Sequence, residues 1–198
     1  QSVLRPEKPW EGRRVNPGNI VYDDKRRTYR MWYGVYNPQA ERERAALRSG
    51  AAGRVGEPQP VYTCYAESGD GVHWERPLLN IYKDPAGPNN IVFKGCSGGG
   101  GGMVIRDSGP AAERYVMANL DWFTTESGGI CLAFSGDGLH WRYKKNEPVI
   151  FGHSDTFNSL VYNPERGVYM LYMRGWHAAA VNWPGLHKGH PRRRIGYA

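Results

Sequence analysis

Carboxylate and imidazole side chains recur together in a short box of this 198-residue chain. Ser-Gly-Asp-Gly-Val-His-Trp carries Asp70 and His73, and Ser-Gly-Asp-Gly-Leu-His-Trp carries Asp137 and His140. A carboxylate at a repeated position is a candidate for catalysis. The same residues also suit a tight turn, in which Asp accepts backbone N–H groups and glycine adopts a positive φ. Because the box is repeated, we interpret both Asp residues as turn residues and both His residues as surface or cross-strand residues.

Metal, redox and phosphate chemistry find little support elsewhere in the chain. The three cysteines, Cys64, Cys96 and Cys131, form no Cys-x-x-Cys pair, so small buried thiols are the better interpretation. His187 and His190 stand on a Gly/Pro-rich segment and give only a weak metal-ligand spacing. The glycine run that follows Cys96 lacks the Gly-Lys-Ser/Thr of a phosphate-binding loop. We therefore expect no metal ion and no cofactor.

The charge of the chain is the next guide to its partners. The formal net charge is +7, from 26 Lys and Arg against 19 Asp and Glu. A basic protein can bind nucleic acid, but these basic residues are not laid out on one face, and no nucleic-acid-binding motif accompanies them. No apolar run approaches the ~18 residues that a membrane-spanning helix needs. We expect neither nucleic acid nor a membrane as a partner.

The elements that position these residues come from an internal repeat. Residues 63–74 and 130–141 are identical at eight of twelve positions, with a constant offset of 67. Each contains a strand, the Ser-Gly-Asp-Gly turn and a Trp that opens a return strand. A second pattern, two strands joined by a polar turn, occurs three times, at residues 20–33, 103–118 and 159–172.

Two hairpins in each repeat predict a sheet of four antiparallel strands, and a radial series of such sheets is a β-propeller. The 26 Gly and 14 Pro agree with many short strands and turns. We expect an all-β fold of about two and a half blades, with blade one at about 12–82, blade two at about 89–151 and an incomplete blade three at about 154–198. An open arc exposes sheet edges. We therefore expect a fragment of a longer protein, or self-assembly of several copies that completes the propeller.

The Ser-x-Asp-Gly-x-x-Trp boxes, the Tyr-rich hairpins and the Asn89-Asn90-Ile91-Val92 opening of the second unit resemble the five-bladed propeller glycoside hydrolases. That group includes glycoside hydrolase families 32 and 43 and their unassigned relatives. The resemblance extends over nearly all of the chain. It implies a complete ring of five blades, hydrolysis of an oligo- or polysaccharide, and an extracellular or periplasmic location. The family 32 motifs Trp-x-Asn-Asp-Pro-x-Gly, Arg-Asp-Pro and Glu-Cys are absent.

The resemblance also implies where the site lies. In the resembling enzymes the pocket surrounds the central axis, where the first strand of each unit begins and the second strand ends. On that face three successive units offer Glu11, Asp121 and Asp155, and glycoside hydrolysis needs two carboxylates that flank the bond. Tryptophan rings can stack on a sugar, and arginine can bind hydroxyl groups. The substrate-binding candidates are Trp10, Asn90, Trp122, His153, Arg174 and Trp176.

Each of these acids has a simpler interpretation that remains open. Glu11 can be a loop acid near Arg13 and Arg14, Asp121 can be a solvated loop residue, and Asp155 can cap a turn. Accordingly, two alternative functions stand beside a glycoside hydrolase. One is a non-catalytic carbohydrate-binding propeller, and the other is a partial propeller that functions only after assembly.

Overall fold

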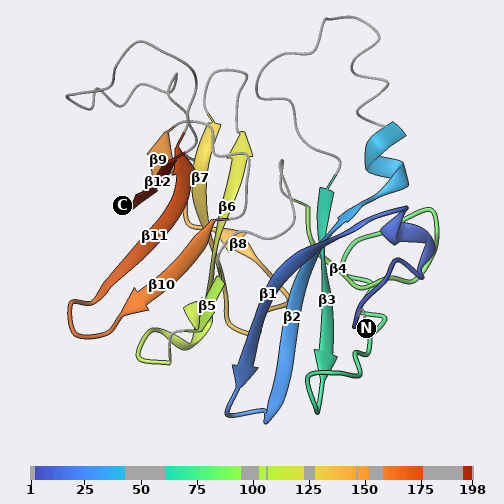
Figure 1. Cartoon of the computed structure of the whole chain (residues 1–198), viewed down its shortest axis with the longest axis horizontal. Coiled ribbons are helices and arrows are strands. Elements are labelled where there is room, and N and C mark those ends of the chain that lie inside the picture. The colour runs from blue at the N-terminus through green and yellow to red at the C-terminus, as the bar shows by residue number, and fades with distance from the viewer. Residues whose placement is uncertain are drawn as a thin grey trace, which may run out of the picture.

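The computed structural model describes residues 3–42, 61–94, 103–105, 107–122, 128–145, 147–151, 158–175 and 194–197. Within these residues the chain is almost entirely β-structure, arranged in three antiparallel sheets that stand side by side (Figure 1). The predicted all-β fold of antiparallel, blade-like sheets is confirmed.

The first sheet contains four strands in sequential order, β1 (Val15–Asp23), β2 (Thr28–Tyr36), β3 (Val61–Ser68) and β4 (Ile91–Phe93). A 3-10 turn, η1 (Pro9–Glu11), precedes it. All three pairings are antiparallel, so side chains alternate between the two faces of the sheet.

The second sheet is ordered β5 (Met103–Ile105), β6 (Tyr115–Trp122), β7 (Gly128–Ser135) and β8 (Arg142–Tyr143). A further short strand, β9 (Ile150–Phe151), pairs with the other end of β7. The fourth position of this sheet is therefore filled by two short pieces of chain instead of one long strand.

The third sheet contains β10 (Ser159–Asn163), β11 (Val168–Gly175) and β12 (Arg194–Tyr197). The three predicted hairpins correspond to β1–β2, β5–β6 and β10–β11. Helical structure among the described residues is limited to η1, a second 3-10 turn η2 (Ala111–Glu113) and a short helix at 38–42. No helix in the described part of the chain is long and apolar enough to cross a membrane.

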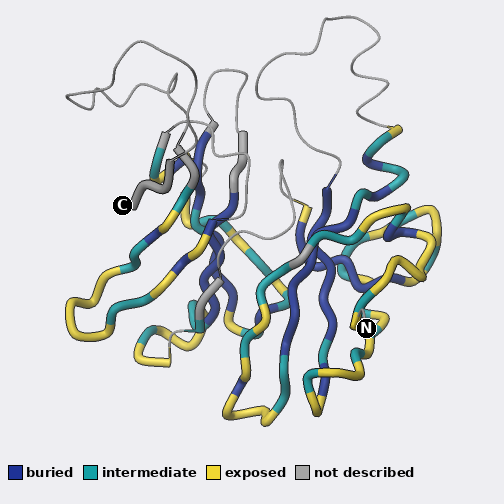
Figure 2. The backbone as a smooth tube through the Cα atoms, in the orientation of Figure 1, coloured by how far each residue is buried: buried dark blue, intermediate teal, exposed yellow. Residues whose placement is uncertain are grey.

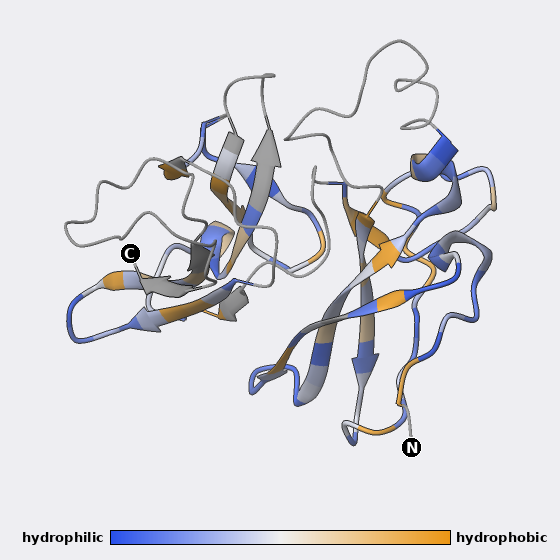
Figure 3. Cartoon of the chain, turned by 45° about the horizontal axis from the view of Figure 1, so that its top comes forward, coloured by the Kyte–Doolittle hydropathy of each residue, from blue (hydrophilic) through white to orange (hydrophobic). Residues whose placement is uncertain are grey.

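Two apolar layers hold the three sheets together, since each sheet buries one face against the next. Trp32 and Tyr65 of the first sheet pack against Tyr115 and Met117 of the second. The opposite face of the second sheet packs against the third, and its contact residues include Val116, Phe134, Leu160 and Leu171. Figure 2 shows burial concentrated along the strands, and Figure 3 shows that the hairpin turns are hydrophilic.

The repeated box forms the same hydrogen-bonded turn twice, as predicted. Asp70 Oδ1 accepts the N–H groups of Val72 and His73, each at 2.8 Å. Asp137 Oδ1 accepts those of Leu139 and His140 at 2.8 and 2.9 Å. The His side chain of each box returns to its Asp, with Nδ1 2.7 Å from Oδ2 in both turns.

The Asn89-Asn90-Ile91-Val92 segment differs from its expected place at the opening of the second unit. Ile91 and Phe93 pair with Cys64 and Thr63, so this segment completes the first sheet. The loop before it folds back on itself, because the backbone N–H groups of Leu79 and Asn80 both donate to the carbonyl of Asn89. β4 thus corresponds to β9 of the second sheet.

Candidate functional site

Glu11, the predicted acid of the first unit, is enclosed by protein at the end of η1. Its carboxylate is 0% exposed. Oε2 accepts the backbone N–H groups of Glu7 and Lys8 at 2.8 and 3.0 Å. Oε1 accepts the Tyr33 hydroxyl at 2.7 Å and lies 2.8 Å from Nε of Arg76. Both oxygens are therefore occupied, and the ion pair is with Arg76, not with the neighbouring Arg13 and Arg14.

Trp10 and Asn90, two of the predicted binding residues, join the same network. Trp10 Nε1 donates to Asn90 Oδ1 at 2.7 Å. Asn90 Nδ2 donates to the Tyr33 hydroxyl at 2.8 Å and to the carbonyl of Tyr65 at 2.6 Å. Trp10 and Asn90 are buried, at 5% and 0% exposure. The network ties η1 and the entry to β4 onto β2 and β3.

The hydroxyl of Tyr33 is the centre of this network. Burial raises the pKa of Tyr33 far above its ordinary value, and the charges of Cys64 and Glu11 act in the same direction. Burial likewise raises the pKa of the Cys64 thiol. Tyr33 therefore stays protonated and serves as a permanent donor to Glu11.

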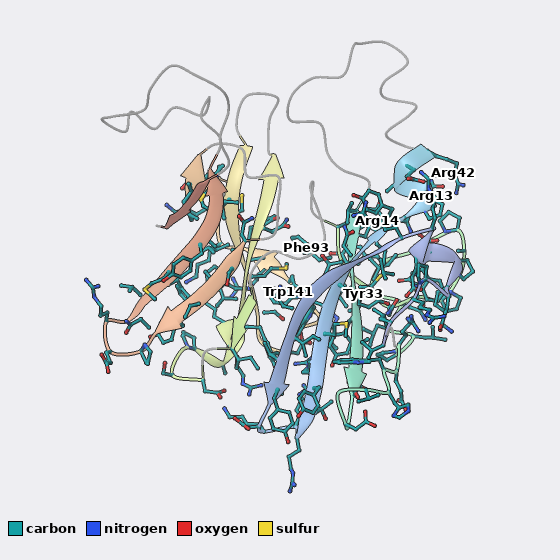
Figure 4. The ribbon with its side chains drawn as sticks, in the orientation of Figure 1. Arg13, Arg14, Tyr33, Arg42, Phe93 and Trp141 are labelled. Atoms are coloured by element: carbon teal, nitrogen blue, oxygen red, sulfur yellow. The ribbon has the colours of Figure 1, made fainter. Side chains whose placement is uncertain are left out.

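This buried network lies on the face of the first sheet that is turned away from the second sheet. Tyr33, Trp10 and Cys64 belong to one apolar cluster, whereas Trp32 and Tyr65 pack against the second sheet. Figure 4 shows the same arrangement. Phe93 and Trp141 lie between the first two sheets, whereas Tyr33 lies on the side of β2 that is turned away from the second sheet. The first sheet consequently stands between Glu11 and strand β6, which carries Asp121.

Asp121, Trp122 and Arg174 are placed at the ends of equivalent strands. Asp121 and Trp122 are the last residues of β6, where they pair with Gly129 and Gly128 of β7. Arg174 lies one residue before the end of β11 and pairs with Ile195. We expected these positions just after the strands, but continued pairing with β7 and β12 extends both strands over them. Both strands end at the top of Figure 1.

Three predicted site residues lie outside the described residues. They are Asp155, His153 and Trp176. The structure thus brings Trp10, Glu11 and Asn90 into one buried cluster, and it places the backbone of Asp121, Trp122 and Arg174 at one end of the second and third sheets.

A charged cluster between the first two sheets is not evident from the sequence, because its acid, Asp23, ends β1 and its main partners, Arg114 and Tyr115, belong to the second unit. Arg114 donates two hydrogen bonds to Asp23, at 2.9 and 2.8 Å, and the Tyr115 hydroxyl donates a third. The Asp23 side chain is 0% exposed. The hydrogen bonds from Arg114, followed by that from Tyr115, outweigh burial and hold its pKa well below the ordinary value.

Arg30 completes the contact between these two sheets. Its Nη2 donates to the carbonyl of Asp137 at 2.7 Å, and Nε1 of Trp32 donates to the carbonyl of Gly138 at 2.7 Å. The Arg30 guanidinium also lies over the Tyr115 ring, 4.8 Å from its centre. Backbone carbonyls of the box turn in the second unit therefore accept hydrogen bonds from side chains of the first sheet.

Metal binding finds no site among the residues that the structure describes. No group of three or more His, Cys, Asp or Glu side chains in that part of the chain is placed to hold an ion. The chemistry that the described arrangement offers is that of carboxylates, hydroxyls and guanidinium groups.

Solved structures of proteins in complex with sugars share this fold. A fructofuranosidase from Schwanniomyces occidentalis bound to fructosylnystose is 20% identical, with a TM-score of 0.55 over 87% of this chain and 31% of that chain. A β-fructofuranosidase from the same organism bound to fructosyl-erythritol is 17% identical, with a TM-score of 0.52 over 87% and 32%. An N-acetylgalactosamine deacetylase from F. plautii bound to blood group B trisaccharide is 16% identical, with a TM-score of 0.50 over 90% and 48%.

These likenesses show the fold, which is that of part of a β-propeller. The chain spans about a third of the length of the two fructofuranosidases and about half of the deacetylase. No protein-family model matches the chain, and no curated protein matches it in sequence.

Proposed function

We propose that this chain belongs to a carbohydrate-active protein that hydrolyses glycosidic bonds. The likeness of its fold to two fructofuranosidases, each in complex with a fructose-containing ligand, carries the proposal. The sequence pattern points the same way, because a tryptophan stands near the end of the second strand in two units, as Trp122 and Trp176, and Asp121 adjoins the first of them. The substrate class is an oligo- or polysaccharide.

The proposed reaction uses two carboxyl groups on opposite sides of the bond. One protonates the glycosidic oxygen as the leaving group departs, and the other attacks the sugar carbon or activates a water molecule. We assign this pair to Asp121, the penultimate residue of β6, and Asp155, which precedes β10 in the sequence. Trp122 and Trp176 would stack on sugar rings, and Arg174 and His153 would bind hydroxyl groups.

Glu11 is the third acid of the proposal, and its surroundings favour a supporting role. A group that acts on substrate must be within hydrogen-bond reach of it. Glu11 is 0% exposed and already holds Tyr33, Arg76 and two backbone N–H groups. Trp10 and Asn90 are buried in the same network. We assign all three residues to the support of the first sheet and not to direct contact with the sugar.

The test is hydrolysis of a panel of furanosides and pyranosides, followed as released reducing sugar. We expect Asp121→Asn and Asp155→Asn each to lower kcat by at least about 10²-fold, the usual loss when a general acid or base is removed. Asp24→Asn is the control, because Asp24 is exposed in the β1–β2 turn. Hydrolysis that survives in both carboxamide variants would contradict the assignment.

A non-catalytic carbohydrate-binding propeller is the second candidate, and the burial of Glu11 favours it, since one of the three predicted acids is closed to solvent. Such a protein would bind an oligosaccharide without releasing reducing sugar. Asp155→Asn would leave that binding unchanged, which separates the two functions in one set of variants.

A further inference from the structure

We infer that the first sheet carries a second, separate site for a neutral polyhydroxylated ligand, at the end of the sheet opposite to the proposed catalytic residues. A cavity of about 500 Å³ lies there, between the β1–β2 turn and the box turn that follows β3. That volume is within the ~300–1,000 Å³ of small-molecule sites. In Figure 1 this end of β2 and β3 is at the bottom.

The wall of the cavity is a row of charged side chains across the sheet. Arg30 of β2 stands opposite Glu67 of β3. Glu67 in turn pairs with Glu75, through backbone hydrogen bonds of 3.0 and 2.8 Å. Residues directly opposite one another point to the same face, so both carboxylates line the cavity with Arg30.

These side chains are held in place at the inner end of the row. Arg30 is 0% exposed, and its Nε donates to the Tyr65 hydroxyl at 2.7 Å. The same hydroxyl donates to Glu67 Oε2 at 2.9 Å. Glu75, at the outer end, is exposed. The row therefore runs from a fixed guanidinium, through an oriented carboxylate, to an open one.

The second unit shows that the fold does not require polar residues here. The strand register places Val116 and Phe134 at the positions of Arg30 and Glu67. Val116 is 0% exposed and Phe134 is 6% exposed, because the third sheet covers them. The first sheet uses charged groups where the second uses apolar ones, and like charges face each other at Glu67 and Glu75 at a cost in stability. That cost is consistent with a binding role.

The mixture of charges selects the kind of ligand. A cation would meet Arg26, whose side chain is half exposed at the rim, and an anion would meet Glu67 and Glu75, while the buried Arg30 forms the inner wall. A hydroxyl group both donates and accepts, so adjacent hydroxyls can satisfy carboxylates and guanidinium groups together. A small neutral saccharide has that chemistry. The inference does not depend on hydrolysis at the other end of the sheets.

Calorimetric titration of the whole chain with sucrose, lactose and xylobiose tests the site. We expect at least one of them to bind, and Glu75→Ala to weaken that binding about tenfold, as expected for the loss of a hydrogen bond to a charged group. Glu67→Phe installs the residue that the second unit has at this position and should abolish the binding. Glu165→Ala, an exposed acid in the β10–β11 turn, is the matched control and should bind as the parent does.

The same titrations can overturn the inference. It fails if no neutral saccharide binds, if only the cation spermidine binds, or if binding is unchanged in both Glu75→Ala and Glu67→Phe while thermal unfolding shows that both variants are folded. Asp121→Asn separates the two sites. It should abolish hydrolysis and leave saccharide binding at the first sheet intact. Failure to detect hydrolysis would contradict only the proposed function and not the presence of this second site.

Discussion

At the scale of single residues, Glu11 shows how a carboxylate can be charged and yet closed to chemistry. It lies at 0% exposure between Tyr33 and Arg76, and the Arg76 side chain is itself only 8% exposed. Removing the charge of Glu11 leaves Arg76, within the described residues, with only the exposed Glu7 as an ion-pair partner, and breaking a buried pair usually costs about 3–5 kcal/mol. The carboxylate of Glu11 is therefore expected to matter more for folding than for turnover.

The variant Glu11→Gln tests this expectation, because the side chain keeps its shape and loses its charge. We expect the free energy of unfolding, measured by urea denaturation, to fall by about 3 kcal/mol. Glu7→Gln is the matched control, since Glu7 also contacts Arg76, at 3.1 Å, but is 60% exposed. It should cost less than about 1 kcal/mol. Equal losses of unfolding free energy in the two variants would contradict this expectation, because they would show that burial of the Glu11–Arg76 pair adds nothing to its contribution.

The lowered pKa of Asp23 predicts how the free energy of unfolding depends on pH. Arg114 lowers the pKa of Asp23, so the folded protein binds its proton less tightly than the unfolded chain does. The stabilisation is complete above the ordinary Asp pKa of about 4 and is lost as pH falls below it. We expect the free energy of unfolding to decline from pH 5 to pH 2, and Asp23→Asn to remove part of that decline. Asp24→Asn, an exposed neighbour, should keep all of it. A decline of the same size in Asp23→Asn would contradict the assignment.

At the scale of elements, the two copies of the box turn are alike in backbone and different in surroundings. Gly71 and Gly138 both have a φ of +77°. A Cβ atom on Gly71 would meet only the Tyr29 ring, at 3.6 Å. A Cβ atom on Gly138 would lie 2.7 Å from Trp32 and 3.0 Å from Arg30. The second turn is therefore also a packing surface for the first sheet.

Alanine substitution separates the two contributions. Gly71→Ala should cost about 1–2 kcal/mol, the strain of a left-handed backbone for a residue with a Cβ atom. Gly138→Ala should cost clearly more, because it also pushes apart the contact between the first and second sheets. Urea denaturation of both variants measures the difference. Indistinguishable midpoints would mean that the Trp32 contact contributes little to the association of the sheets.

The same elements show which structural features could be read from the sequence. The box turns were predictable because their hydrogen bonds join residues within three positions, such as Asp70 and His73. The three hairpins were predictable because each pairs two strands that follow one another in the sequence. The place of Ile91–Phe93 was not, because it depends on pairing with Thr63 and Cys64, and its entry is held by the bond of Asn90 to Trp10, 80 positions away. The role of Asp23 could not be predicted for the same reason, since its partner Arg114 is 91 positions away. Long-range partners, Tyr33 and Arg76, also account for the burial of Glu11.

At the scale of the whole molecule, the stacking of sheets leaves one face without a neighbour among the described residues. The face of the third sheet that is turned away from the second carries Val161, Val168 and Tyr172, which are 42%, 42% and 43% exposed. The register places Tyr172 of β11 where Ala118 lies in β6, and Ala118 is 0% exposed against the third sheet. The third sheet thus exposes an apolar face at the position where the first and second sheets are each covered by the next sheet.

We expect this surface to make the 198-residue chain associate with other copies as its concentration rises, because an exposed apolar sheet face is covered by the nearest complementary surface. Light scattering after gel filtration should give a mass above 22.3 kDa that increases with loading. Val161→Lys places a charge in the middle of the face and should return the chain to a monomer. Val72→Lys is the control, since Val72 is 56% exposed on the box turn, far from this face. A monomeric parent chain at all concentrations would show that the third sheet tolerates its open face, and association that survives Val161→Lys would place the contact elsewhere.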